Sequence, residues 1–169
     1  HDYKVDFFPE TTPVIDGPAT RVMNLRDGTK KMSKSGESDM ERINMTDDAD
    51  KIAKKFKKAK TDPEPLPETV DGLADRPEAR NLVEIYASLN DATPADVINE
   101  YAGAQWGRFK PALADLAVAK LAPISTEMAR YMDDPAEIDR ILGDGAGRAR
   151  AIAEPILRKT YDILGMLRS

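Results

Sequence analysis

Two lysines and two serines lie together in the polar segment Lys31-Met32-Ser33-Lys34-Ser35. Lysine carries a compact ammonium on a flexible stem, and serine carries a hydroxyl that donates or accepts a hydrogen bond. A loop with these groups at this spacing can close on the oxygens of a polyphosphate. A polar loop of this kind can equally be a solvated connection between two elements. The residue types leave both interpretations open, so the order of the residues must decide between them.

The five residues in this order resemble the second signature of class I aminoacyl-tRNA synthetases. The surrounding sequence is similar to one family of that class, the tryptophanyl-tRNA synthetases. The similar segments are residues 19–25, 42–48, 54–62, 81–86, 106–110 and 145–150. They follow the family's order along nearly the whole chain, so the resemblance is far more specific than the five-residue motif alone.

The resemblance implies a reaction with two steps. The carboxylate of L-tryptophan is joined to the α-phosphate of ATP with release of pyrophosphate, and the amino acid then passes to tRNA(Trp). In such transfers the protein works mainly by positioning groups and by stabilising the charge that grows on the leaving group. On the matching positions, Lys31 and Lys34 are implied to be catalytic, contacting the β- and γ-phosphates with Mg²⁺ alongside.

The resemblance also implies which residues bind ATP around these lysines. Val22 and Met32 match positions whose main chain meets the edge of adenine, although core packing explains Val22 equally well. Ser33 and Ser35 would add hydroxyl donors or shape the loop. Gly36-Glu37 stands where the family commonly has Asp-Pro, which predicts a more flexible stretch after the loop.

Composition excludes several classes of protein. The chain has no cysteine and one histidine, so disulfides and a zinc site of nitrogen and sulfur ligands are not expected. Any metal should be magnesium that arrives with the nucleotide, with no site held by the protein itself. No apolar run approaches the roughly 18 residues of a membrane span, and no secretory signal is evident. We therefore expect a cytoplasmic protein without a membrane partner.

The net charge of −5 argues against indiscriminate binding to nucleic acid. The charge is unevenly distributed, because residues 30–60 contain ten basic and six acidic side chains, which leaves −9 for the rest of the chain. Six of these cations are lysines between positions 51 and 60. Their helical spacing predicts that they mostly face water or a partner such as tRNA.

The sequence predicts a mainly α fold: a helical anticodon-binding-type domain preceded by the last strand and loop of a Rossmann-like α/β nucleotide domain. We expect residues 1–45 to be the tail of the catalytic domain, 46–132 the tRNA-contacting helices, and 133–169 carboxy-terminal helices that pack back on the catalytic domain. The packing of residues 133–169 on the catalytic domain is implied by the resemblance alone. The chain opens on His1, and the family's first signature and its tryptophan pocket have no counterpart here, so we expect an inactive fragment of a homodimeric enzyme.

Local signals place the elements. Residues 22–25 should form a buried strand that ends at the Asp27-Gly28 turn. A helix with Ile52, Phe56 and Ala59 on its apolar face is expected after an N-cap at Thr46. Further helices are expected from Pro77 to about residue 90, from Pro94 to a stop at Gly103, and from about residue 109 with a kink at Pro123. Two more should run from an Asp134 cap to Gly143, and from about residue 149, past a fault at Pro155, to Gly165.

Tyr86, Tyr101 and Phe109 lie on these predicted helices, and Trp106 is the only tryptophan. Trp106, beside Arg108 and Lys110, could stack on an unpaired RNA base, but aromatic residues at helical spacing more often belong to the core. The closest alternative function is a tyrosyl-tRNA synthetase fragment. Another is a helical RNA-binding module without catalysis.

Overall fold

The computed structural model describes residues 4–15 and 21–167. The predictions for His1 and for residues 17–20 lie outside this part of the chain. The described elements are η1 Asp39–Glu41, α1 Ala49–Lys57, η2 Val70–Leu73, α2 Pro77–Leu89, α3 Pro94–Tyr101, α4 Trp106–Met132 and α5 Pro135–Leu164. The expected mainly α fold is confirmed. Contacts group residues 15–129 into one compact unit, and residues 1–14 with 130–169 into another.

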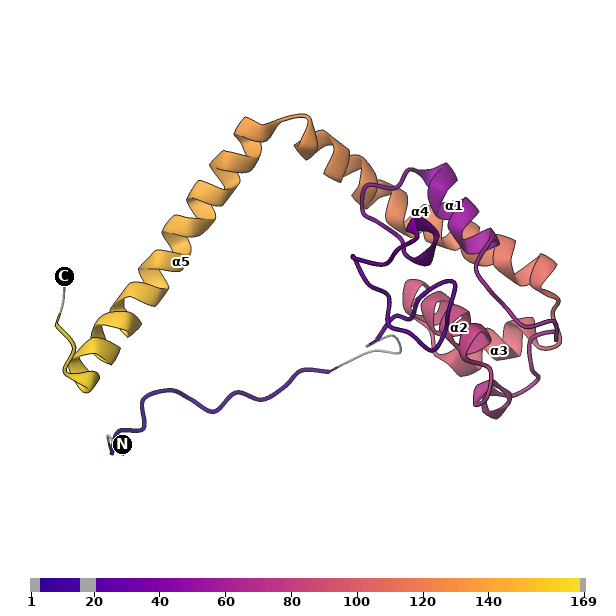
Figure 1. Cartoon of the computed structure of the whole chain (residues 1–169), viewed down its shortest axis with the longest axis horizontal. Coiled ribbons are helices and arrows are strands. Elements are labelled where there is room, and N and C mark those ends of the chain that lie inside the picture. The colour runs from indigo at the N-terminus through magenta and orange to yellow at the C-terminus, as the bar shows by residue number, and fades with distance from the viewer. Residues whose placement is uncertain (1–3, 16–20, 168–169) are drawn as a thin grey trace. The chain divides into compact units, whose positions relative to one another are not determined.

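The core lies in the first of these units, where α1, α2 and α3 gather around the first part of α4 (Figure 1). The predicted apolar positions Ile52 and Phe56 of α1 are 0% and 2% exposed. They meet Leu82 and Val83 of α2 and Phe109 of α4 in one continuous cluster. Burial of these side chains supplies the main stabilisation of this unit.

Several of the predicted helix ends are confirmed. Pro77 opens α2, and Thr93 with Asp96 forms a capping box at α3. Gly103, after α3, has a φ of +66°, the left-handed conformation that glycine adopts without strain. At α1 the prediction was wrong by two residues, because Asp48 and not Thr46 accepts the hydrogen bond from the first turn.

The predicted strand at residues 22–25 is not formed among the described residues. Met23 and Lys31 make a single antiparallel bridge, with Met32 N–H donating to the Val22 carbonyl at 3.0 Å. A strand needs neighbouring strands to satisfy its backbone groups, and this segment has none. The buried amide of Asn81 on α2 takes their place, since it accepts from Met23 N–H and donates to the Met23 carbonyl, both at 3.0 Å.

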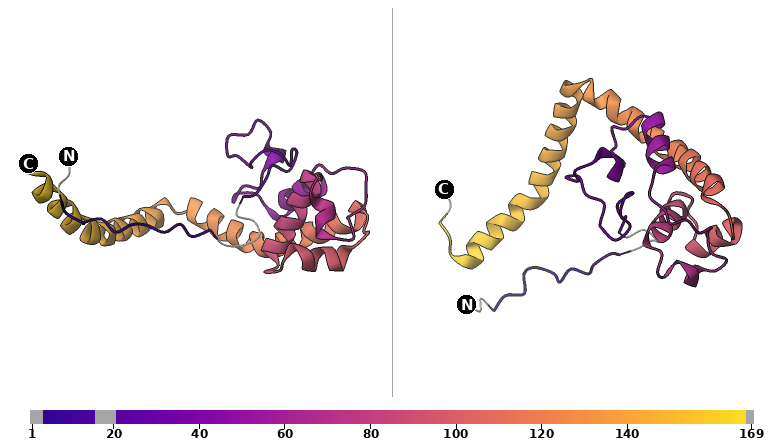
Figure 2. Two further views of the ribbon diagram at one scale, coloured as in Figure 1. Left: turned by 90° about the horizontal axis from the view of Figure 1, so that it is seen from below. Right: turned by 45° about the vertical axis from the view of Figure 1, so that its right-hand side comes forward.

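The predicted turn at Asp27-Gly28 is confirmed and rests against the start of α2. A methyl group on Gly28 would lie 2.5 Å from the backbone carbon of Pro77. Glycine is therefore needed for this close approach, and it sets the segment before the loop firmly on α2. Figure 2 shows the segment before α1 standing on one side of the helices of its unit.

One predicted break in the later helices is not observed. Helix α4 continues through Pro123 to Met132, so Pro123 does not break it, and the kink expected there stays a prediction. The predicted stop at Gly143 was wrong, because α5 runs without interruption to Leu164, where Gly165 ends it in the left-handed conformation. A glycine within a helix costs only about 1 kcal/mol relative to alanine, so it does not end a helix unless the chain also turns there.

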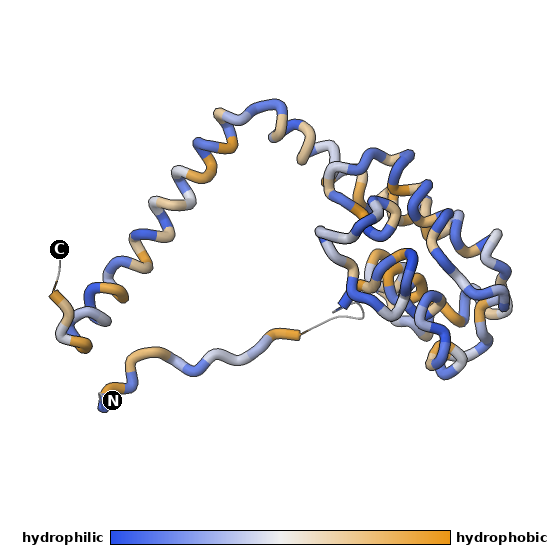
Figure 3. The backbone as a smooth tube through the Cα atoms, in the orientation of Figure 1, coloured by the Kyte–Doolittle hydropathy of each residue, from blue (hydrophilic) through white to orange (hydrophobic). Residues whose placement is uncertain are grey.

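Helix α5 carries apolar and polar residues in alternation along its length (Figure 3). No residue of α5 is buried, and Ile152 is 72% exposed. The expectation that these helices pack on a catalytic domain stays a prediction, as does the division at residues 45 and 132. No helix among the described residues is long and apolar enough to cross a membrane.

Candidate functional site

A pocket of about 670 Å³ lies at the predicted phosphate loop. Of the predicted site residues, Val22, Lys31, Met32, Ser33 and Lys34 all line it. The bridge between Met23 and Lys31 holds the two sides of this site together. The structure therefore brings the predicted residues into one pocket, except for Ser35.

The two lysines are exposed, and within the described residues neither forms an ion pair. Their neighbour Lys30 instead pairs with Asp27 at 3.3 Å. Hydrogen bonds from Thr29 to Asp27 lower the pKa of that carboxyl, so it stays ionised beside Lys30. The ammonium groups of Lys31 and Lys34 thus remain available to an anion.

The loop closes on itself through its serines. The hydroxyls of Ser33 and Ser35 lie 3.1 Å apart, and Ser35 N–H donates to the Ser33 hydroxyl at 3.3 Å. Of the two predicted roles for Ser35, the shaping of the loop is the one visible in these contacts. Ser33 combines both, because its side chain also lines the pocket.

Sequence reasoning gave no role to two arginines in the same pocket, Arg21 and Arg42. Arg42 donates to the carbonyls of Gly36 and Ser38 at 3.0 and 3.2 Å and to the side-chain oxygen of Asn44 at 3.2 Å. These contacts link the stretch just after the loop to Arg42, and the flexibility predicted for that stretch stays a prediction. Arg42 lies in residues 42–48, one of the segments that are similar to the family. This similarity was the only signal in the sequence that could have pointed to Arg42 as a site residue.

The lining of the pocket is partly apolar. Ile43, Met45 and Met128 line it together with Val22 and Met32. A pocket lined by both cations and apolar side chains suits a nucleotide, whose base is flat and weakly polar and whose phosphates are anionic. Val22 and Met32 are half-buried and pack against the core, so packing and ligand contact are both open to them.

The lysines of α1 follow the predicted pattern with one exception. Lys51, Lys54, Lys57 and Lys58 are exposed. Lys55 was wrongly included in this solvent-facing set, since its side chain is 2% exposed and donates to Asp47 at 2.6 Å. A buried ammonium is stable only when paired, and Asp47 together with Asp39 supplies the pair.

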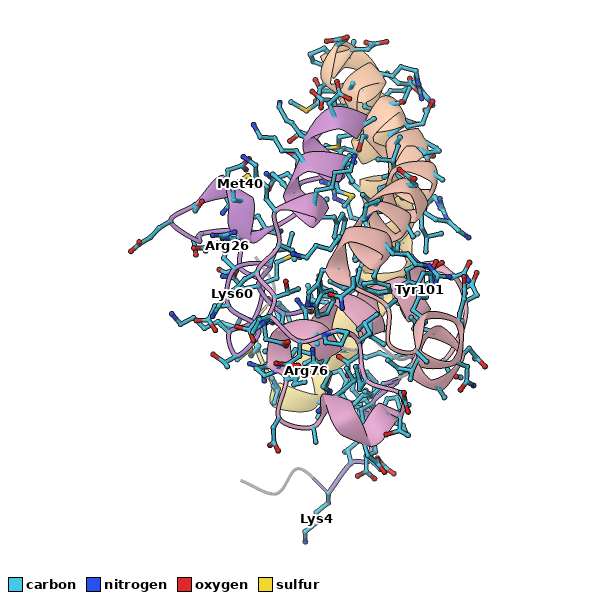
Figure 4. The ribbon with its side chains drawn as sticks, turned by 90° about the vertical axis from the view of Figure 1, so that its right-hand side faces the viewer. Lys4, Arg26, Met40, Lys60, Arg76 and Tyr101 are labelled. Atoms are coloured by element: carbon cyan, nitrogen blue, oxygen red, sulfur yellow. The ribbon has the colours of Figure 1, made fainter. Side chains whose placement is uncertain are left out.

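The predicted aromatic residues belong to the core. Phe109 is fully buried, and its ring centroid lies 5.1 Å from that of Tyr101 on α3, which is labelled in Figure 4. Burial raises the pKa of Tyr101, whose hydroxyl lies 3.2 Å from that of Tyr86. Trp106 is half-buried and donates its ring N–H to the Asp62 carbonyl at 2.8 Å. Packing therefore accounts for Tyr86, Tyr101 and Phe109, and stacking of Trp106 on RNA stays a prediction.

The described residues contain no cluster of three or more acidic, histidine or cysteine side chains that could hold a metal ion. The lysine and arginine side chains at the pocket attract anions and repel a free metal ion. A divalent cation would fit here only in company with phosphates that outweigh its charge. The arrangement can hold a polyphosphate and stabilise negative charge as it develops.

Comparison with known proteins places the chain in a class. The family model for class I tRNA synthetases (W and Y) matches residues 4–122. This match covers more than half of the chain, which therefore belongs to the family of class I tRNA synthetases for tryptophan and tyrosine.

Among the relatives, the tryptophan branch is the one that the chain resembles. It is 59% identical over 162 residues to the tryptophan–tRNA ligase of Agrobacterium fabrum and 60% identical over 161 residues to that of Mesorhizobium japonicum. These alignments cover 96% and 95% of this chain but 46% and 45% of the two ligases. The chain thus spans about half the length of the curated relatives that it matches.

A solved structure shares the fold. The crystal structure of tryptophanyl-tRNA synthetase from Mycoplasma pneumoniae superposes with a TM-score of 0.70 at 24% identity, covering 89% of this chain and 47% of that one. At this identity the likeness concerns the fold alone. It agrees with the mainly helical architecture described above.

Proposed function

We propose that the chain is the part of a tryptophan–tRNA ligase that carries the phosphate loop and the tRNA-contacting helices. Its full-length protein activates L-tryptophan with ATP, brought as the Mg²⁺ complex, and transfers it to tRNA(Trp) in the cytoplasm as a homodimer. The observation that supports this best is the pocket that gathers Lys31, Lys34 and Arg42 together with apolar side chains. The 54–60% identity to several tryptophan–tRNA ligases supports the choice of amino acid.

In this proposal Lys31 and Lys34 bind the β- and γ-phosphates and stabilise the pyrophosphate as it leaves. Val22 and Met32 border the base, and Ser33 and Ser35 hold the loop in shape. The full-length ligase for experiments is the gene product that contains this chain. An equivalent is the A. fabrum ligase with this chain in place of its matching residues.

The isolated chain should not activate tryptophan. The amino-acid pocket that the resemblance implies has no counterpart in these 169 residues. Tryptophan-dependent exchange between pyrophosphate and ATP measures this, with the full-length ligase as the positive control. Exchange above background from the 169-residue chain would contradict the proposal that it holds only part of the site.

The exposed lysines of α1 should contact the tRNA backbone. Changing Lys54, Lys57 and Lys58 to alanine in the full-length ligase should weaken tRNA(Trp) binding and leave tryptophan activation intact. Each lost phosphate contact should reduce the slope of log affinity against log salt by up to about 0.9, because fewer counterions are released.

The control for this experiment is a variant with the same change in charge on α5, in which Arg140, Arg158 and Lys159 are replaced by alanine. These residues are exposed and lie outside the expected tRNA-contacting helices. The control should keep the parental slope. Equal slopes for both triple variants would assign the α1 lysines to plain solvation.

A further inference from the structure

Lys55 stands apart from the other lysines of α1 because its ammonium is removed from water. Its Nζ atom lies 2.6 Å from Asp47 Oδ2 and 2.9 Å from Asp39 Oδ2. Asp47 is also buried, with a side chain that is 5% exposed, whereas that of Asp39 is 59% exposed. A buried charge without partners is strongly unfavourable, so Lys55 holds these carboxylates in place.

The two carboxylates belong to the stretch that connects the phosphate loop to α1. Asp47 accepts from Asn44 N–H at 2.8 Å, and the Asn44 amide donates to Asp39 at 2.7 Å. Arg42 donates to Asn44 and to the carbonyl of Gly36, which directly follows the loop. Arg42 and Asn44 also line the pocket with Lys31 and Lys34. A continuous chain of polar contacts thus joins the buried ammonium to the end of the loop.

The other arm of the loop is tied to the end of the same helix. Lys60 N–H donates to the Leu25 carbonyl at 2.7 Å, and Leu25 N–H donates to the Glu41 carbonyl at 3.0 Å. The Arg26 side chain donates to the Lys58 carbonyl, and Figure 4 labels Arg26 and Lys60 on these neighbouring segments. Both arms are therefore fixed to α1, and Lys55 is the buried charge of α1 to which the outgoing arm is paired through Asp39 and Asp47.

We propose that Lys55 is a positioning residue: its ion pairs with Asp39 and Asp47 hold the outgoing arm of the loop so that Lys31 and Lys34 meet the polyphosphate in the transition state. This inference rests on the catalytic role proposed for these two lysines. Lys55 itself does not touch the substrate. It acts through the loop, and this separates it from a residue that merely stabilises the fold.

The test compares Lys55→Met and Asp39→Asn in the full-length ligase, by single-turnover formation of tryptophanyl adenylate. Lys55→Met removes both ion pairs, and we expect the maximal rate to fall about tenfold, since small displacements of positioned groups cost this much or more. Asp39→Asn keeps the shape but removes the charge of the exposed partner, and we expect a loss of about threefold, because solvent already screens that pair.

A double-mutant cycle with Lys34→Ala distinguishes positioning from plain stability. If Lys55 acts through the loop, both variants should lower the rate by less than about twofold once Lys34 is absent. The control is Arg76→Met, which breaks the 2.6 Å ion pair with Asp62, away from the loop, and should keep the parental rate. If the Lys55→Met variant does not fold, the double-mutant cycle of Asp39→Asn with Lys34→Ala provides the same test.

Effects that add fully to that of Lys34→Ala, or an unchanged rate in both variants, would overturn the inference. The proposed function would survive that result, provided Lys34→Ala alone is slow. If Lys34→Ala and Lys31→Ala keep the parental rate, the catalytic role of the loop fails instead, so the two failures are distinguishable.

Discussion

Replacing Lys34 or Lys31 by alanine in the full-length ligase should lower the rate of tryptophan activation by about a hundredfold or more. Both ammonium groups lie at the same pocket and are free of ion pairs within the described part of the chain. In the proposed reaction, charge on the pyrophosphate grows as it leaves, so we expect their interaction to be stronger in the transition state than with bound ATP. The loss of one such placed donor costs on the order of 3 kcal/mol.

Tryptophan-dependent exchange of pyrophosphate at saturating ATP measures this loss. Lys30→Ala is the matched control, because Lys30 is exposed, pairs with Asp27 and does not line the pocket. It should keep the parental rate. Arginine should rescue poorly at positions 31 and 34, since a planar guanidinium does not reproduce a compact ammonium on a flexible stem. Full rescue by arginine would mean that charge alone is needed.

Replacing Phe109 by alanine should destabilise the unit formed by residues 15–129 by about 3 to 5 kcal/mol. The side chain is fully buried, and its ring lies within 5.1 to 6.1 Å of the rings of Tyr86, Tyr101 and Trp106. Its removal loses apolar burial and leaves a cavity beside the rings of α2 and α3. Chemical unfolding of the chain, followed by circular dichroism, measures the change in the free energy of unfolding.

Phe8→Ala is the control of the same chemistry, because Phe8 is 64% exposed. Its replacement should change the free energy of unfolding by less than about 0.5 kcal/mol. A loss below about 1 kcal/mol for Phe109→Ala would contradict the account of this aromatic cluster as the core of the helical unit.

Much of the helical unit could be predicted because its signals are local. The Thr93 and Asp96 capping box, the Pro77 start and the Gly103 stop each act within one turn, and apolar spacing identified Ile52 and Phe56. The prediction that a helix ends at Gly143 was wrong because it too relied on a local signal. A glycine in the sequence does not reveal whether the chain turns at that position.

The missed features depend on contacts between distant residues. The side chain of Asn81 replaces a neighbouring strand for Met23, 58 positions earlier in the chain. Lys55 looked like one of several surface lysines, and only the fold shows that Asp39 and Asp47 surround it. Such partners are brought together by tertiary structure. The spacing of apolar residues along the sequence cannot predict these contacts.

The candidate site was predictable to the extent that its residues are close in sequence. Lys31, Met32, Ser33 and Lys34 form one short loop, and the structure places them with Val22 in one pocket. Met128 reaches the same pocket from α4, about a hundred positions away, and no pattern in the sequence points to it. Its contribution follows from the course of α4 past the loop.

The most direct test of the central claim is the single-turnover rate of tryptophanyl adenylate formation, measured against ATP concentration for the full-length ligase and its Lys34→Ala variant. Such a curve separates the maximal rate from the affinity for ATP. Our account predicts a maximal rate about a hundredfold lower with a much smaller change in ATP affinity. An unchanged maximal rate with weakened ATP binding would show that the loop only clamps the nucleotide, and would contradict the catalytic role proposed for Lys31 and Lys34.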